Sequence, residues 1–359
     1  MTVDIALNIF ESVTTQESKM QLSFLLYLLV NKSCYSLSIQ DDISQTPFFK
    51  EMPNTLKEVV EEAFMTTIMS SSQADCWVGV GYESEMVKRK FSLQEAISFL
   101  MEPSTIVLEN ALNDAYFIDA LFRSYDDTGQ MRNYLDAGWL HYDNAGGCGN
   151  ILNFLQARVN HFQGKTKFLK CYVIVDGDKL YPKQVQSKYN NLKRKLSEWG
   201  VGIHVLEKRT MENYMPLPVL QEQQNANQRE WVSAYEHLSA IQKDYLSFSG
   251  GFSYDAPKAE KDALKKDLKR FKKRKAQLRD NHFVKKYMSS DRRVLYTDIS
   301  NGNFCHLANG FPTKGTFKDS FPRLYQSRLA NRNGFDAITA HQTDSKELKS
   351  LVESLYKIM

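Results

Sequence analysis

Between residues 105 and 216 the chain alternates short apolar runs with longer stretches of helical periodicity. The apolar runs are Ile106–Leu108, Trp139–Tyr142, Cys171–Val175 and Ile203–Leu206. Short β-branched runs bounded by turn residues are typical of buried strands. The intervening stretches with helical spacing are 114–125, 150–162 and 184–199. Because strands alternate with helices, the pattern predicts βαβ units, a parallel sheet and an α/β fold class.

Before residue 105 and after residue 216, apolar residues recur at the spacing of an α-helix. Helices are predicted at 16–31, 55–69, 93–101, 230–246 and 346–359. Ser92 and Glu95 have the spacing of a capping box, and Pro103 ends that helix. The prediction is therefore three domains: a helical N-terminal cap or interaction domain (1–103), a parallel-sheet domain (104–218) and a basic, mostly helical C-terminal domain (219–359).

Acidic residues follow the predicted strands at their carboxyl ends. Glu109 closes the first strand, Asp176 and Asp178 close the third, and Glu212 comes after the fourth. Ligands of open α/β sheets bind outside these ends, so the carboxylates are expected to converge. Converging carboxylates repel one another unless a cation lies between them, and ligation by oxygen alone suits Mg²⁺ or Mn²⁺. The sequence thus predicts a divalent metal site at this edge.

The same residues resemble the TOPRIM domain of topoisomerases, primases and OLD-type nucleases. The resemblance rests on Glu109 at the end of the first strand, on Asp176-Gly177-Asp178, and on the order of the elements between them. The segment 206–214, with Arg209 and Glu212-Asn213-Tyr214, resembles the L-x-x-R-x-x-E-N-Y ending of TOPRIM nucleases that serve bacterial anti-phage systems, often beside an ABC-type ATPase. The resemblance as a whole covers about a third of the chain.

The resemblance implies a metal-dependent nuclease whose activity a partner ATPase controls. It implies that Glu109, Asp176, Asp178 and Glu212 are catalytic metal ligands, with Glu109 also acting as general acid/base. The chain departs from the family pattern after Glu109, where Asn110 replaces the usual Gly and the next acid is one position late, at Asp114. Asp114 is therefore either a fifth metal ligand or the cap of the following helix.

Two further groups near these acids are candidates for binding phosphate. Gly146 and Gly147 lie in a glycine-rich loop before a predicted helix, where backbone N–H groups cradle phosphate or simply form a tight turn. Lys208 and Arg209 either contact a phosphate or balance the charge of Glu207 and Glu212, which are close to them in the sequence.

Two residues beside Glu212 and one in the fourth strand have predicted supporting roles. Asn213 and Tyr214 are expected to orient the Glu212 carboxylate by hydrogen bonds. His204 lies within an apolar strand, so it is expected to be a core residue rather than a base.

Positive charge is concentrated in one segment, although the whole chain of 359 residues carries only +4. Residues 258–293 hold fifteen Lys and Arg against five Asp and Glu. Leu264, Leu268 and Phe271 form one helical stripe there, and the other faces present cations. The candidate nucleic-acid contacts are Lys269, Arg270, Lys272 and Lys273. The segment predicts salt-sensitive, sequence-independent binding to the phosphate backbone of DNA or RNA, with a solvated charge run as the alternative.

Cysteine usage and hydropathy indicate a cytoplasmic protein without a membrane anchor. The five Cys are scattered and lack zinc spacing, which favours reduced thiols. No signal peptide opens the chain, and its longest apolar run, Leu22–Val30, is shorter than the roughly 20 residues that a membrane span needs.

No nucleotide-binding loop is predicted in the chain. Gly164-Lys165-Thr166 resembles the end of a P-loop, but Val159 stands where the first Gly is required. Any ATP would thus be bound by a partner. Two other interpretations remain: a primase-like or topoisomerase-like phosphoryl-transfer enzyme, and a non-catalytic subunit that binds nucleic acid or a partner. The N-terminal region would form a cap, a homodimer contact or a partner surface.

Overall fold

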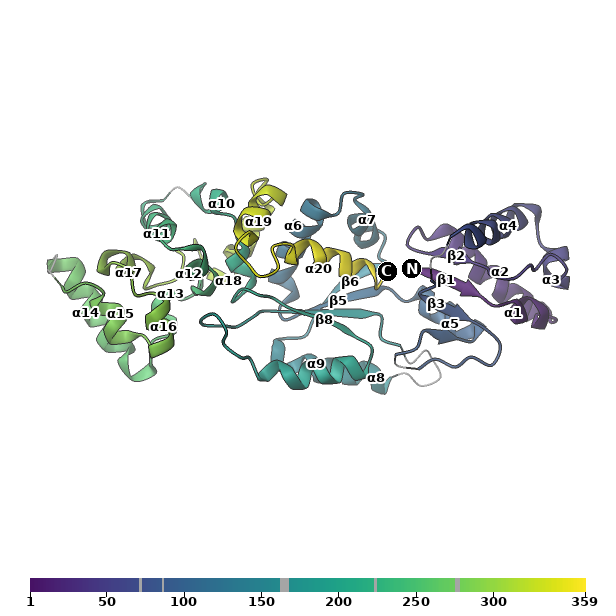
Figure 1. The fold of residues 1–359 in the computed structure, drawn as a ribbon, viewed down its shortest axis with the longest axis horizontal. Helices are drawn as coiled ribbons and strands as arrows, with labels where there is room; N and C mark the ends of the chain where they lie inside the picture. Colours follow the sequence, from purple (N-terminus) through teal and green to yellow (C-terminus); the bar gives the residue numbers. More distant parts are fainter. Residues whose placement is uncertain (71–72, 86, 162–167, 223–224, 275–277) are drawn as a thin grey trace.

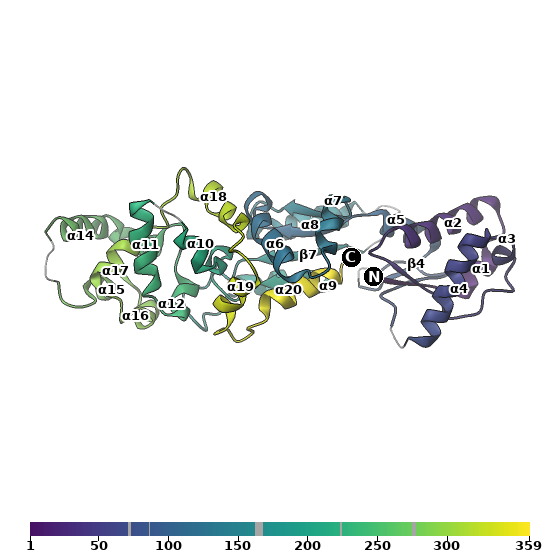
Figure 2. The same ribbon diagram turned by 90° about the horizontal axis from the view of Figure 1, so that it is seen from above.

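The protein is an elongated molecule with two parallel sheets and a helical region at one end (Figure 1). The computed structural model describes residues 1–70, 73–85, 87–161, 168–222, 225–274 and 278–359. Among the helices in these ranges, none is long and apolar enough to cross a membrane. A view from above shows the same order of parts along the long axis (Figure 2).

The first hundred residues contain a parallel sheet where only helices were predicted. In the spatial order β2-β1-β3-β4, its strands are β1 (Thr2–Ile5), β2 (Ser36–Ser38), β3 (Cys76–Val78) and β4 (Lys90–Phe91). The helices around it are α1 (Leu7–Ser12), α2 (Gln16–Asn31), α3 (Pro47–Glu51), α4 (Asn54–Met69) and α5 (Leu93–Met101). The predicted helices at 16–31, 55–69 and 93–101 are present, but the sheet among them was not predicted. Strands of two to four residues contain too few alternating positions to be recognised as strands.

The second sheet confirms the predicted parallel arrangement. In the order β6-β5-β7-β8, its strands are β5 (Ser104–Leu108), β6 (Leu140–Asn144), β7 (Cys171–Val175) and β8 (Gly202–Val205). Each pair of neighbours runs parallel. The accompanying helices are α6 (Ala111–Tyr125), α7 (Gln130–Asp136), η1 (Cys148–Asn150), α8 (Ile151–Asn160) and α9 (Lys188–Glu198).

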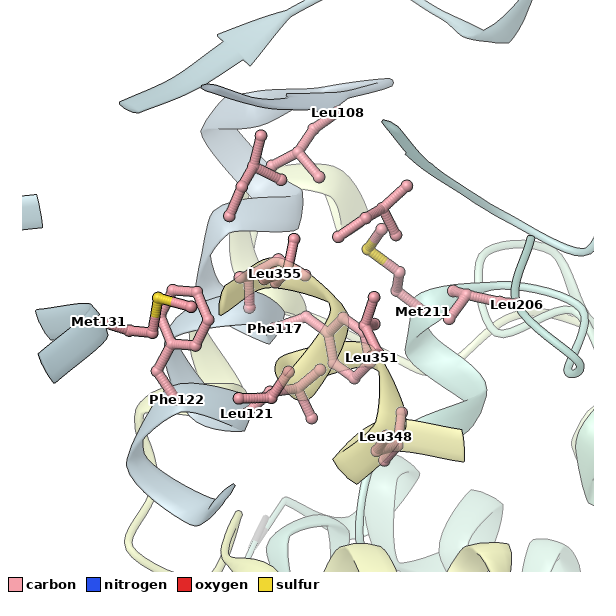
Figure 3. Packing of buried hydrophobic residues seen from close by; sticks show 14 of the residues in the cluster. Leu108, Phe117, Leu121, Phe122, Met131, Leu206, Met211, Leu348, Leu351 and Leu355 are labelled. Carbon is pink, nitrogen blue, oxygen red and sulfur yellow. The ribbon is translucent and has the colours of Figure 1, made fainter. Parts of the chain in front are cut away.

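Both faces of the second sheet are covered, which explains its uninterrupted apolar strands. Ile106 and Leu108 belong to the large hydrophobic core that also contains the buried side chains of α6. Val107, between them, belongs to a separate core formed with α8 and α9. Figure 3 shows Leu108 near Phe117 of α6 and Leu355 from the C-terminal end of the chain. A strand buried on both faces has no polar side to show, as its sequence predicts.

The rest of the chain is largely helical, as predicted. Its elements are η2 (Met211–Tyr214), α10 (Leu217–Gln221), α11 (Ala226–Glu236), α12 (Ala240–Tyr245), α13 (Gly251–Tyr254), η3 (Lys258–Glu260), α14 (Lys261–Arg274), α15 (His282–Tyr287), α16 (Ser290–Leu295), α17 (Asn301–Leu307), α18 (Phe317–Ser320), η4 (Pro322–Gln326), α19 (Arg332–Thr339) and α20 (Glu347–Tyr356). The predicted helix at 230–246 is two helices, because Ser239 caps α12. The chain then runs back to the second sheet, where α19 and α20 pack against α6.

The two ends of the chain meet between the sheets (Figures 1 and 2). Ser104 of β5 donates a hydrogen bond to the Ile358 carbonyl oxygen at 2.6 Å. Lys170, just before β7, is buried there; its ammonium donates to the Tyr35 hydroxyl at 2.5 Å and to the Glu102 carbonyl oxygen at 3.0 Å. Both partners are uncharged, so this lysine joins the two sheet regions without an ion pair.

Burial makes Lys170 a source of pH-dependent stability. Loss of water around the ammonium lowers the pKa of Lys170 to about 7, against about 10.4 in an unfolded chain. Between these values the unfolded chain binds more protons, so the free energy of unfolding rises with pH. We expect Lys170→Met to remove this rise, which amounts to about 2 kcal/mol between pH 7 and pH 9.

Urea unfolding of wild type and Lys170→Met at several pH values measures this difference. Lys50→Met, at an exposed lysine of α3, is the matched control and should keep the wild-type pH dependence. Tyr35 retains a hydrogen bond to the Leu100 carbonyl oxygen in the variant, so the junction should stay intact. Parallel curves for wild type and Lys170→Met would contradict the assignment.

Candidate metal centre

Glu109 joins the ends of three strands of the second sheet. It follows β5, and its carboxylate accepts hydrogen bonds from the backbone N–H of Asp176 at 3.2 Å and of Cys148 at 3.1 Å. The first donor follows β7 and the second follows β6. Burial raises the pKa of Glu109, while the two N–H donors oppose the shift. The carboxylate is thus fixed at the carboxyl edge, where the sequence predicted it.

Asp176 lies at the centre of the acidic residues. Its carboxylate accepts a hydrogen bond from the Met211 backbone N–H at 2.8 Å, which connects the end of β7 to η2. Burial, followed by the charges of Glu212 and Glu109, raises the pKa of Asp176 well above its usual value. Carboxylates from β7, η2 and the end of β5 therefore converge, as the strand pattern predicted.

Gly177 and Asp178 pass directly under the chain that leaves β8. A Cβ atom added to Gly177 would lie 2.1 Å from the Lys208 carbonyl oxygen and 2.4 Å from that of Leu206. The Asp178 N–H donates to the Arg209 carbonyl oxygen at 2.7 Å, and Asp178 has a left-handed backbone with φ 51°. The glycine between the two acids is thus required by close backbone packing.

Among the described residues, the Asp178 carboxylate is the member of the acidic group that forms an ion pair with a cation. It forms an ion pair with Lys188 of α9 and accepts a hydrogen bond from the Tyr189 hydroxyl at 3.2 Å. The same hydroxyl donates to the Asp176 carbonyl oxygen at 2.5 Å. Lys188 and Tyr189 lie 10 and 11 positions after Asp178, and no motif in the sequence marks them as part of the site.

Asp114 belongs to the acidic group and also supports the start of α6. Asn110, and not Asp114, is the N-cap residue of this helix. The Asp114 carboxylate reaches back to accept a hydrogen bond from the Asn110 N–H at 2.8 Å. Burial raises the pKa of Asp114 to about 7, and the charges of Glu212 and Glu109 add to the shift. The cap alternative is therefore wrong, because Asn110 holds the cap position and Asp114 supports it from the first turn, and the role of Asp114 as a metal ligand stays a prediction.

Glu212 is held by the backbone of η2 alone. Within the described residues, its carboxylate has no hydrogen-bond or ion-pair partner. The prediction that Asn213 and Tyr214 orient it was wrong. Asn213 donates to the Lys243 and Leu246 carbonyl oxygens, at 2.7 and 2.9 Å, and Tyr214 donates to the buried Glu347 carboxylate at 2.5 Å. Both residues fix the position of η2, from which the half-buried Glu212 extends.

The Lys208 and Arg209 side chains are held in buried ion pairs, which argues against their candidate role in binding the phosphates of a polynucleotide. Their side chains are 2% and 6% exposed. Lys208 forms an ion pair with Asp244 of α12, and Arg209 forms a two-pronged pair with Asp255 at 2.7 and 2.8 Å. They therefore balance distant acids and not their sequence neighbours, and both side chains are largely covered.

His204 and the glycine loop also have positioning roles. His204 Nε2 lies 2.9 Å from a carboxylate oxygen of the buried Glu347, but the His204 side chain is half-buried and is not a core residue as predicted. Gly146 and Gly147 both have positive φ angles, 74° and 113°, which explains the glycines. The Gly147 N–H donates to the Glu109 carbonyl oxygen at 2.9 Å, so the loop holds Glu109 and does not present that donor to a phosphate.

The basic helix α14 is exposed but lies away from the acids. Leu264 and Leu268 are buried, whereas Lys269, Arg270, Lys272 and Lys273 are exposed, so the predicted division of faces is present. In both views α14 lies at the end of the molecule, with the other helices between it and the second sheet (Figures 1 and 2). The candidate P-loop residues Gly164, Lys165 and Thr166 lie outside the described residues.

The acidic group fits a divalent cation in charge and donor type. In the described part of the chain, no three His, Cys, Asp or Glu side chains are already arranged to hold a metal ion. Burial raises the pKa of Asp114 and of Asp176, and the charges of the neighbouring carboxylates add to both shifts. A hard cation would relieve this repulsion. A bound metal would thus require a rearrangement of side chains.

Comparisons with family models, with curated proteins and with solved structures found no match for this chain.

Proposed function

We propose that this chain is a divalent-metal-dependent nuclease in which Glu109, Asp114, Asp176, Asp178 and Glu212 hold Mg²⁺ or Mn²⁺. One observation carries the proposal: carboxylates from separate elements converge at the carboxyl edge of a parallel sheet and raise one another's pKa. Repulsion between clustered carboxylates lowers the stability of the folded protein, so stability alone does not favour the cluster. A cation-binding site does require such a cluster.

The chain's own residues would divide the work between holding and proton transfer. The bound metal would polarise the scissile phosphate and lower the pKa of a water molecule. Glu109 is fixed by two backbone donors, and its raised pKa suits the general acid/base role that the TOPRIM resemblance implies. Lys188 would retain Asp178 at the edge of the site through their ion pair.

The position of α14 favours a long substrate. The exposed cations of this helix would hold the phosphate backbone at one end of the molecule, while the acids lie at the second sheet. A polynucleotide bound by both must extend across the intervening helices. Short oligonucleotides would therefore lack the contribution of α14 and be cleaved less efficiently.

The direct test is cleavage of plasmid DNA, single-stranded DNA and tRNA by the wild-type protein with Mg²⁺ or Mn²⁺. The proposal expects cleavage of at least one substrate, lost on addition of EDTA and restored by excess metal. Calorimetric titration with Mn²⁺ is measured in parallel. Mn²⁺ binding without cleavage of any substrate would favour the binding-subunit interpretation over the nuclease.

Charge reversal on α14 should weaken nucleic-acid binding without affecting the metal. Lys272→Glu combined with Lys273→Glu places acids where phosphates would lie, and each lost phosphate contact lowers the salt dependence of binding by about one unit of slope. Filter binding at several salt concentrations measures this slope. The control is Lys50→Glu combined with Lys193→Glu, two exposed lysines on α3 and α9, which changes the net charge equally. Equal losses in both double variants would contradict a role for α14.

A second candidate function is a non-catalytic subunit that binds nucleic acid or a partner. It is favoured by the absence, within the described residues, of side chains already arranged for a metal. The primase-like or topoisomerase-like alternative, the ABC-type ATPase partner and a homodimer through the N-terminal region remain predictions from the sequence.

A further inference from the structure

A pocket of about 250 Å³ lies beside the segment that follows β8, on the side of Lys208 and Asn213. Its walls come from that segment and from α10, α11, α12 and α19. Met215, Leu217, Tyr235 and Ile338 give it an apolar surface. The remaining lining includes charged side chains, which the nuclease proposal does not use.

The charges around the pocket favour an anion. Lys208, Lys243 and His341 line it with a single carboxylate, Asp244. That carboxylate is already occupied by the Lys208 ammonium and lies 2.6 Å from His341 Nε2. Lys208 also donates to the Ile338 carbonyl oxygen at 2.8 Å, so one of its three N–H donors remains.

Lys243 adds a second donor at this pocket. Its ammonium has one long hydrogen bond, 3.4 Å to the Glu236 carbonyl oxygen, and lies 5.4 Å from the centre of the Tyr235 ring. It can therefore turn toward a ligand at small cost. Because the acid is already paired and two ammonium groups retain donors, the polar end of an occupant should carry negative charge.

The size and walls of the pocket define the rest of the ligand. At roughly 30 Å³ for each water, the volume corresponds to about eight waters. Tyr235 offers a ring, and Leu217 and Ile338 offer aliphatic surface. We propose that this pocket binds a small anion, a carboxylate or a phosphate monoester, on a flat apolar body of about the size of a benzene ring.

Such a ligand would contact the segment that also shapes the acidic site. Lys208 lines the pocket, while its backbone carbonyl oxygen packs against Gly177 between Asp176 and Asp178. Asn213, the neighbour of Glu212, lines the pocket as well. The pocket is therefore placed to influence these acids, but the binding proposal does not depend on nuclease activity.

Calorimetric titration of the full chain with four probes tests the proposal. Benzoate and phenyl phosphate carry both the ring and the charge, benzamide lacks the charge, and inorganic phosphate lacks the ring. We expect Kd of about 1 mM or tighter for at least one of the first two, and at least about tenfold weaker binding of both controls. The tighter of the two identifies the carboxylate or the phosphate as the preferred group.

Two variants locate the binding. Lys243→Gln removes the cation, and Ala337→Trp fills the pocket from an exposed position on α19, so both should keep the fold, which circular dichroism checks. Each should weaken binding of the preferred probe at least about tenfold. Absence of binding by both charged probes, equal binding of benzoate and benzamide, or unchanged affinity in both folded variants would overturn the proposal.

Discussion

Replacing Asp176 by Asn is expected to abolish metal-dependent cleavage while making the metal-free protein more stable. The pKa of Asp176 is raised by burial and by the charges of Glu212 and Glu109, so above the usual pKa of an aspartate this carboxyl group lowers the stability of the metal-free protein. Asn retains the oxygen that accepts from the Met211 N–H but removes the charge. We expect a gain in the free energy of unfolding, because each unit of a raised pKa that is removed corresponds to about 1.4 kcal/mol. Activity and Mn²⁺ affinity should fall at least about 100-fold.

The opposite signs of these two effects distinguish a metal site from an ordinary buried network. Replacement of a purely structural carboxylate would lower the stability of the protein, because the groups that donate hydrogen bonds to it would be left unpaired. Asp143→Asn is the matched control: Asp143 lies near the carboxyl end of β6 but pairs with Arg158. Chemical unfolding with EDTA, unfolding with Mn²⁺, and cleavage are measured for all three proteins. A less stable Asp176→Asn protein that still cleaves would contradict the proposed centre.

The sequence predicts the second sheet well because its strands are buried on both faces. Cys171–Val175 is a strand with the predicted bounds, and the other three differ from prediction by a few residues at their ends. The first sheet was missed because the same logic needs length. Ser36–Ser38 is mostly polar, and Lys90–Phe91 is a single pair. Such strands are specified by their neighbours in space, which a local pattern does not contain.

For the site, the sequence predicts which acids converge but not which groups surround them. Strand ends in a parallel sheet share one edge, so Glu109 and Asp176 could be placed together before the structure was known. The partners of Lys208 and Arg209 could not be, because Asp244 and Asp255 lie 36 and 46 positions away in the sequence. The sequence suggests that neighbouring acids balance the charge of Lys208 and Arg209, whereas the fold supplies acids from distant positions.

Gly177→Ala should have the largest effect on stability of any single methyl group added at the site. The new Cβ would lie 2.1 Å from the Lys208 carbonyl oxygen, and backbone on both sides cannot turn away as a side chain can. The segment after β8 would have to move by about 1 Å, which strains the hydrogen bond from the Asp178 N–H to the Arg209 carbonyl oxygen. We expect a loss of about 3 kcal/mol, at the upper end for overpacking.

The same displacement should separate the acids, since this segment leads directly into η2 and Glu212. We therefore expect the folded fraction of Gly177→Ala to lose the stabilisation by Mn²⁺ that wild type gains. Gly149→Ala is the control, because a Cβ there meets nothing within 4 Å and the residue lies on the neighbouring loop. Urea unfolding with and without Mn²⁺ measures both effects. If Gly177→Ala unfolds like Gly149→Ala, the chain after β8 does not pack against Gly177, and the geometry that unites Asp176, Asp178 and Glu212 is incorrect.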